Sequence, residues 1–191
     1  DIYSRKIVGW EVHESESAEQ AATLVEKACW AEHIRRDSLV LHSDNGSPMK
    51  GATMLAKLQK LGVVPSFSRP SVSNDNPYSE SLFRTLKYTP AYPAKPFGSL
   101  EEARTWVQHF VQWYNGTHRH SGLKFVTPNE RHEGQDNTIL ANRKVIYDAA
   151  KKAHPERWSG ATRDWHPIGS VWLNPAKVDG ANDTVVLEKA A

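Results

Sequence analysis

The sequence has little sulfur, no long apolar segment and no dominant sign of charge. Cys29 is the only cysteine among 191 residues, which excludes an intrachain disulfide and favours a reducing compartment. No apolar run is long enough to span a bilayer. The sequence also lacks a basic-then-apolar leader, so we do not expect secretion. Because 24 Lys and Arg stand against 22 Asp and Glu, a local patch matters more for binding than the net charge. We expect a cytoplasmic protein with a real core, since 39% of the residues are hydrophobic.

A start methionine is also missing, and the chain runs almost at once into an apolar segment. Residues 6–13 are rich in β-branched and aromatic side chains, which predicts a strand. A chain that starts so close to a strand is typical of the middle of a sheet. We therefore expect this sequence to be a fragment whose parent contains earlier strands.

Strand and helix patterns alternate along most of the chain. Short β-branched runs predict strands, and apolar residues at helical spacing predict helices. The expected elements are strands at 6–13, 39–43 and 63–67 and helices at 18–36, 51–61, 77–87, 100–115 and 139–153. Pro65 indicates an edge strand, whereas Asn76 and Pro77 suit the cap and first position of a helix. Strand, helix and strand in this order predict a layered α/β fold with crossover connections.

Two carboxylates stand where a strand ends and where a helix begins. Asp44 directly follows the strand at 39–43, and Glu80 lies in the first turn after Pro77. Hard oxygen ligands on rigid elements suit Mg²⁺, and two such ions support phosphodiester chemistry. The alternative readings are local: Asp44-Asn45-Gly46 is a turn sequence, and a Glu in a first helical turn complements the helix dipole.

Two cations follow Glu80 along the same predicted helix. At helical periodicity, one face carries Glu80, Arg84 and Lys87. A second, apolar face is expected to carry Leu82, Phe83 and Leu86. The first face fits a carboxylate beside two cations that hold DNA phosphates. It fits equally well an ordinary i, i+4 ion pair between Glu80 and Arg84.

Taken together, these motifs resemble a known family. Asp44-Asn45-Gly46, followed by the segment 76–81 with Glu80 and then by Lys87, is similar to the second and third acids of DDE transposases and retroviral integrases. Residues 1–10 resemble a hairpin and strand of the same core. A third likeness lies further along the chain. It is to the segment that closes the core in bacterial insertion-sequence transposases made from a second, frameshifted reading frame. The residues that carry it are Trp113-Tyr114-Asn115, Arg119-His120, Leu123 and Thr127-Pro128. The resemblance covers most of residues 1–135.

The resemblance implies a ribonuclease H-like α/β fold, the integrase core, with a mixed sheet flanked by helices. Asp44 and Glu80 would be the catalytic residues and would bind Mg²⁺ or Mn²⁺ for cleavage and strand transfer at transposon ends, in DNA integration and recombination. Lys87 and Arg84 would hold DNA phosphates at the transposon ends. The expected partners are transposon-end and target DNA and further copies of the chain, in a nucleoid-associated bacterial cytoplasmic complex.

The family's first acid, an Asp on the opening strand, has no counterpart in this sequence. Asp1 lies where the family has a turn, so we expect it to cap that turn. With two of three carboxylates, we expect weak metal binding and no activity of residues 1–191 alone. The alternative functions are a non-catalytic DNA-binding or assembly remnant of a transposase and a purely hydrolytic nuclease of the same fold.

Three histidines lie close to these motifs. His42 shares a strand face with Asp44 and could orient a carboxylate, but a packed or hydrogen-bonded histidine is favoured. His118 and His120 lack the Cys pair or spaced His set of a zinc site. We expect Arg119 and His120 to position the closing helix or to contact DNA phosphates, with a solvated loop as the alternative.

The predicted organisation is a partial catalytic core at 1–135 and a helical, Trp-rich extension at 136–191. In the extension, cations alternate with aromatic residues, which suits DNA binding by charge and stacking; a partly ordered extension that needs a partner is the alternative. The residues concerned are Arg157, Trp158, Arg163, Trp165, Trp172 and Lys177. Weak strand patterns occur at 171–173 and 184–187. The polar segment 68–76 is either a flap over an active site or a plain connector.

Overall fold

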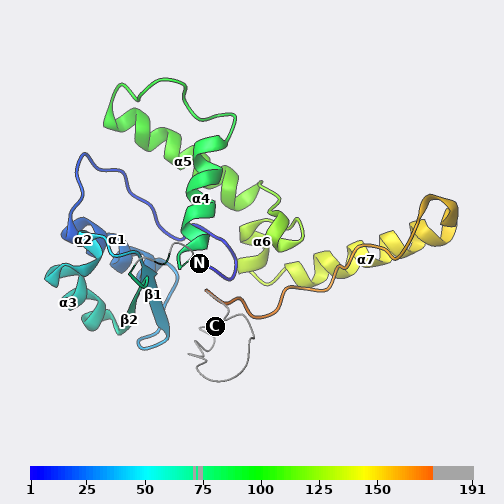
Figure 1. Ribbon diagram of the computed structural model, residues 1–191, viewed down its shortest axis with the longest axis horizontal. Coiled ribbons are helices and arrows are strands. Elements are labelled where there is room, and N and C mark those ends of the chain that lie inside the picture. Colours follow the sequence, from blue (N-terminus) through cyan, green and yellow to red (C-terminus); the bar gives the residue numbers. More distant parts are fainter. Residues whose placement is uncertain (71, 73–74, 174–191) are drawn as a thin grey trace. The chain divides into compact units, whose positions relative to one another are not determined.

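The structure, a computed structural model, describes residues 1–70, 72 and 75–173 (Figure 1). These residues form two compact units. The first contains Asp1–Ile7 and His109–Val171, and the second contains Val8–Gln108 with Trp172 and Leu173. In the described part of the chain, no helix is both long and apolar enough to cross a membrane.

The helices and strands follow the predicted alternation. In chain order they are α1 (Ala18–Ala31), β1 (Leu39–Ser43), α2 (Ser47–Lys50), α3 (Ala52–Leu61), β2 (Val63–Phe67), α4 (Pro77–Tyr88), α5 (Leu100–Gly116), the 3₁₀ turn η1 (Ser121–Leu123), α6 (Pro128–His132), α7 (Asp136–Ala153) and the 3₁₀ turn η2 (Pro155–Arg157). The short helices α2 and α6 were not expected from the sequence. Helix α1 ends five residues earlier than its apolar periodicity predicts, and α7 begins three residues earlier.

The sheet of the second unit consists, among the described residues, of β1 and β2. The two strands are parallel, and their register pairs Leu39 with Val63 and Ser43 with Phe67. Helix α3 connects them and ends at Gly62, whose φ of 70° is the left-handed conformation that glycine adopts without strain. Parallel strands end at the same edge of a sheet, so the residues after Ser43 and after Phe67 emerge side by side.

Helices α1 and α3 cover this sheet with a small apolar core (Figure 1). Its fully buried members are Ala22, Cys29, Met54, Leu58 and Val63. Ser17 begins α1 as predicted, since its hydroxyl accepts hydrogen bonds from the amides of Glu19 and Gln20. The core thereby fixes the strands whose ends carry the candidate site.

The predicted strand at residues 6–13 is wrong. No strand of the described chain lies beside this segment, so its backbone has no ladder partner. In the first unit, the side chain of Asn115 replaces a neighbouring strand at Ile7: Oδ1 accepts from the Ile7 amide and Nδ2 donates to the Ile7 carbonyl, both at 2.9 Å. In the second unit, Gly9 packs against Leu24 and Ala28 of α1. The expected mixed sheet is thus, in the described residues, a two-stranded parallel sheet.

The core of the first unit includes a residue from the chain beyond α7. Leu123, Val126 and Leu140 pack with Trp165, which is 5% exposed. Arg163 lies over the Trp165 ring at 5.6 Å and over the Phe125 ring at 5.2 Å. These two tail residues therefore serve packing within the unit. Residues 171–173 form no strand, and Lys177 and 184–187 lie outside the described residues.

Arg131 of α6 joins three parts of the first unit. Its guanidinium, 2% exposed, donates to the Tyr3 carbonyl at 3.0 Å, to the Ile168 carbonyl at 2.7 Å and to the Asp136 carboxylate. The predicted role of Asp1 is confirmed: its carboxylate caps the N-terminal turn by accepting from the amides of Tyr3 and Ser4 at 2.9 and 3.1 Å. The N-terminal turn, α6, α7 and residue 168 are thus held together.

Candidate active site

Asp44 stands immediately after β1, and two hydrogen bonds fix the turn that carries it. The Gly46 amide donates to Asp44 Oδ1 at 3.0 Å, and Asn45 Nδ2 donates to the Ser68 carbonyl at 2.8 Å. The second bond ties this turn to the chain that leaves β2. The turn interpretation of Asp44-Asn45-Gly46 is therefore correct. It leaves Asp44 Oδ2 without a hydrogen-bond partner within the described residues.

Glu80 lies in the first turn of α4, as the sequence predicts. Asn76 is the N-cap residue and Pro77 occupies the first position, although the Asn76 side chain makes no capping hydrogen bond. The Glu80 side chain is exposed. Over the residues that the structure describes, its carboxylate has no ion-pair partner, Arg84 included. The local alternative, an i, i+4 ion pair, is thus not formed.

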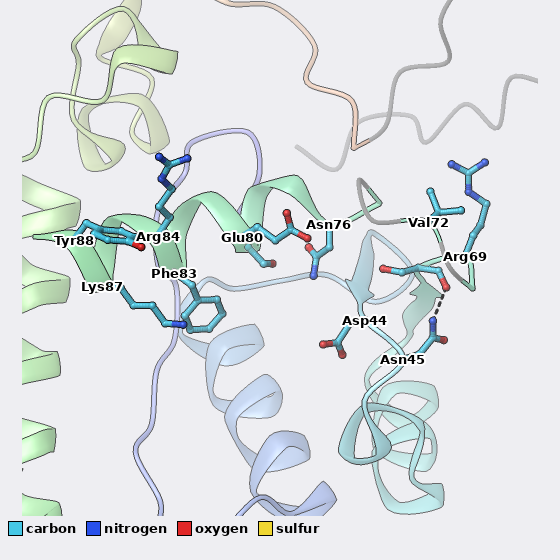
Figure 2. Close-up of a pocket in the computed structure, with 12 residues that line it drawn as sticks. Asp44, Asn45, Arg69, Val72, Asn76, Glu80, Phe83, Arg84, Lys87 and Tyr88 are labelled. Atoms are coloured by element: carbon cyan, nitrogen blue, oxygen red, sulfur yellow. Dashed lines mark hydrogen bonds between the residues drawn. The ribbon is translucent and has the colours of Figure 1, made fainter. Parts of the chain in front are cut away.

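Both carboxylates line one groove of the second unit, with a volume of about 820 Å³. Its walls come from the turn after β1, from the segment between β2 and α4, and from one side of α4. Arg84 and Lys87 line the same groove. Figure 2 shows Asp44 on the turn and Glu80 and Lys87 on the helix across from it. Residues predicted from two separate motifs, the turn after β1 and one face of α4, therefore line one groove.

Phe83 does not belong to the apolar face on which the sequence analysis placed it. It lines the groove and is 58% exposed, whereas Leu82 and Leu86 are partly buried. The reason lies in helical geometry. Three residues advance about 300° around an α-helix, so Phe83 lies only about 60° from Glu80. The groove side of α4 therefore carries an aromatic ring among its charged residues.

The segment between β2 and α4 is closed by an ion pair that the sequence analysis missed. Asp75 is 5% exposed and accepts from the Arg69 amide at 2.8 Å, from Arg69 Nε at 2.9 Å and from Arg69 Nη2 at 2.7 Å. The hydrogen bonds to Asp75 raise the pKa of the Arg69 guanidinium. Opposite charges at the two ends of a polar segment were the available signal. The pair ties the chain that leaves β2 to Asp75, which lies two residues before the start of α4.

His42 makes hydrogen bonds rather than lining the groove. Its Nδ1 lies 3.0 Å from Ser66 Oγ, and its Nε2 lies 3.4 Å from Ser68 Oγ. The favoured interpretation, a hydrogen-bonded histidine, is confirmed. Its contacts join β1 to β2 and to the residue after it.

Arg119 and His120 belong to the first unit. Arg119 Nη1 donates to both oxygens of Glu130, at 2.8 and 2.6 Å, which links it to α6. His120 is partly buried beside Tyr114 and His118. Burial, and then the charge of Arg5, lower the pKa of His120 to about 4, so the ring is neutral at pH 7. Their packing role fits the expectation, and their contact with DNA stays a prediction.

In the described residues, no group of three His, Cys, Asp or Glu side chains is arranged to hold a metal ion.

Two successive parts of the chain match family models. Residues 1–73 and residues 61–128 each match a model described as an integrase core domain. The chain belongs to the integrase core family. The predicted α/β integrase-core fold class is thereby confirmed, and the relatives in the next paragraph confirm the resemblance to insertion-sequence transposases.

Curated relatives of this integrase core protein are transposases of bacterial insertion sequences. The transposase for insertion sequence element IS904 of Lactococcus lactis is 31% identical over 131 residues, which are 68% of this chain and 51% of that protein. The putative transposase for IS986/IS6110 of Mycobacterium tuberculosis is 26% identical over 119 residues, 60% of this chain and 43% of that protein. Transposase InsF for IS3A of Escherichia coli is 28% identical, covering 68% and 45%. The chain spans about half the length of these relatives.

Similar solved structures include retroviral proteins. The catalytic core domain of BIV integrase has a TM-score of 0.48 and 22% identity, covering 68% of this chain and 79% of that one. A simian T-cell lymphotropic virus intasome, solved with the PP2A regulatory subunit B56 gamma, has a TM-score of 0.49 and 13% identity, covering 62% and 41%.

Proposed function

We propose that this chain is the catalytic-core part of a DNA transposase, with Asp44 and Glu80 as metal ligands. The observation that supports it most is that both carboxylates line one groove together with Arg84 and Lys87. The relatives named as transposases support the same reaction class, polynucleotidyl transfer at the ends of a mobile element.

The residues of the groove fit a hard divalent cation. Asp44 Oδ2 and the Glu80 carboxylate are oxygens without partners within the described chain, and Mg²⁺ or Mn²⁺ prefers such ligands with several waters retained. When bound, the ions would supply Lewis-acid activation of the attacking oxygen and neutralise the leaving group. Two carboxylates alone bind weakly, so we expect residues 1–191 alone to show no turnover.

The cations of α4 would hold and orient the DNA strand. Arg84 and Lys87, both exposed, would pair with phosphate oxygens on either side of the scissile bond, which aligns a water or a terminal 3′-hydroxyl for in-line attack. For Arg119 and His120 of the first unit, a contact with DNA phosphates is proposed separately. We propose residues 1–135 as the catalytic core and 136–191 as its extension, in a homo-oligomer on DNA of a bacterial nucleoid.

Metal binding by single carboxylate variants tests this proposal. Mn²⁺ binding to the full chain, followed by electron paramagnetic resonance and calorimetry, should be lost in Asp44→Asn and in Glu80→Gln. Glu101→Gln is a matched control, because Glu101 is also an exposed carboxylate in the first turn of a helix, α5, but lies outside the groove. It should bind Mn²⁺ as the wild type does.

Unchanged Mn²⁺ affinity in both groove variants would overturn the assignment of the ligands. A second measurement concerns the reaction. In the parent protein with its element's own DNA ends, joined strands are expected, and Asp44→Asn should abolish joining while circular dichroism stays unchanged. Products of hydrolysis alone would show that the chain comes from a nuclease rather than from a transposase.

A further inference from the structure

Phe83 is a large apolar side chain exposed inside a charged groove. It is 58% exposed, and within the described residues its ring makes no ring-stacking or cation contact. Single exposed apolar residues are ordinary on protein surfaces, and Trp30, 70% exposed on α1, is one of them. Phe83 differs because it lines the groove that also holds both candidate metal ligands.

The position of Phe83 along α4 relates it to the groove's charges. Glu80 lies three residues before it and Lys87 four residues after it, so the ring stands about one turn from each. Figure 2 shows the Phe83 ring and the Lys87 side chain projecting from the same side of the helix. A strand held by Lys87 with its reacting phosphate near Glu80 would therefore place a base within reach of the ring.

An exposed aromatic ring beside cations is the combination that binds single-stranded nucleic acid, since cations hold the backbone and rings stack on bases. In an intact duplex the base faces are covered by their neighbours. Apart from the outer face of a terminal base pair, only an unpaired or frayed nucleotide can offer a free face to Phe83. We propose that Phe83 stacks on an unpaired base, so that the groove prefers DNA ends with single-stranded terminal nucleotides. This inference deepens the proposed function and names its substrate class.

The test compares two DNA probes with the full chain. One is a short blunt duplex, and the other is the same duplex with unpaired 3′ nucleotides that include 2-aminopurine. Binding is measured with EDTA present, so the result does not depend on the metal ligands. The wild type should bind the overhang probe about tenfold more tightly, equivalent to about 1.4 kcal/mol, and should quench 2-aminopurine fluorescence by stacking.

Variants separate stacking from charge and from packing. Phe83→Leu should bind both probes equally without quenching, while Phe83→Trp should keep the preference. Trp30→Leu, which removes an exposed ring outside the groove, should behave as the wild type. Lys87→Ala should weaken both probes by the same factor.

Equal wild-type affinity for both probes, or a preserved preference in Phe83→Leu, would overturn the inference. A change of sedimentation coefficient in Phe83→Leu with no change of probe preference would do the same, because it would assign the ring to a contact between copies. These outcomes are independent of the Mn²⁺ result. If the wild type shows no preference while Asp44→Asn loses Mn²⁺ binding, stacking alone is refuted; if the wild type shows the preference and Asp44→Asn binds Mn²⁺ unchanged, the metal assignment alone is refuted.

Discussion

Arg131 and Asp136 form an ion pair whose side chains are 2% and 3% exposed. The same guanidinium donates to the carbonyls of Tyr3 and Ile168 and lies 4.0 Å from the centre of the Tyr3 ring. A buried charge is tolerated only when its partners satisfy it completely. This pair therefore holds the first unit together at the point where three chain segments meet.

Removal of one partner should destabilise that unit strongly. We expect Arg131→Ala to lower the free energy of unfolding by about 3–5 kcal/mol, because Asp136 would stay buried without its counter-ion. Urea unfolding followed by circular dichroism measures this loss. Arg119→Ala is the control, since its ion pair with Glu130 has an arginine side chain that is 52% exposed and should contribute at most about 1 kcal/mol. Similar losses in the two variants would contradict the assignment.

Acid should destabilise the first unit through His120. Its pKa is about 4 in the folded chain and about 6.5 in the unfolded chain. Between these values the unfolded state binds more protons, so stability rises with pH from 4 to 6.5 and is lost as pH falls through that range. The expected loss is about 1–3 kcal/mol, since the ring is partly exposed and each pKa unit corresponds to about 1.4 kcal/mol.

Urea midpoints across this pH range measure the effect. His120→Asn should flatten the dependence, because the amide oxygen can still accept the Gly122 amide hydrogen bond that His120 Nδ1 accepts. Burial also lowers the pKa of His118, so a smaller slope of the same sign should remain. The exposed His154 provides the control variant His154→Gln, which should keep the full slope. A wild-type slope in His120→Asn would refute this account.

The phosphate contacts of α4 should be visible as a dependence of DNA affinity on salt. Lys87→Ala should weaken binding of any DNA sequence and reduce the slope of log affinity against log salt concentration by about 1. Arg84→Ala should act in the same direction. Lys60→Ala, which removes an exposed lysine of α3 outside the groove, should leave the slope unchanged. An unaltered slope in Lys87→Ala would exclude Lys87 from the interface.

The ion pair of Arg69 with Asp75 should control the order of the first turn of α4. Asp75→Asn removes charge from the acceptor of three hydrogen bonds, so amide hydrogen exchange at Glu80, whose amide donates to the Asn76 carbonyl, should accelerate several-fold. Arg69→Lys keeps the charge but not the two-pronged geometry, and it should have a smaller effect in the same direction. Exchange rates equal to those of the wild type in Asp75→Asn would show that α4 begins where it does without the ion pair.

The parts of the fold that the sequence predicted are those encoded locally. Apolar runs predicted β1, β2 and α3, and Gly62 marks the boundary between α3 and β2. Asn76 and Pro77 predicted the start of α4. Asp44 and Glu80 could be found because each stands at the end of such an element. Their meeting in one groove depends on the parallel pairing of β1 with β2, which the sequence analysis did not specify.

The parts that sequence reasoning missed depend on contacts between distant segments. Residues 6–13 have strand composition, yet a strand needs a neighbour, and Asn115, more than a hundred positions later, provides the hydrogen bonds at Ile7. Trp165 was placed in an extension, but its ring completes a core with Leu123 and Leu140. Phe83 was misplaced for a different reason. It lies only about 60° around the helix from Glu80, which places it beside the charged face and not on the apolar one.

The pairing of Ser43 with Phe67 at the end of the ladder also constrains how this site can evolve. Strand side chains alternate between faces, so loss of a single residue within Leu39–Ser43 would rotate Asp44 away from α4 while leaving its local turn intact. Substitutions that keep the number of residues in β1 leave the direction of the Asp44 side chain unchanged, whereas deletion of one residue reverses it. The number of residues from the start of β1 to Asp44 therefore matters more for this site than the identity of most side chains between them.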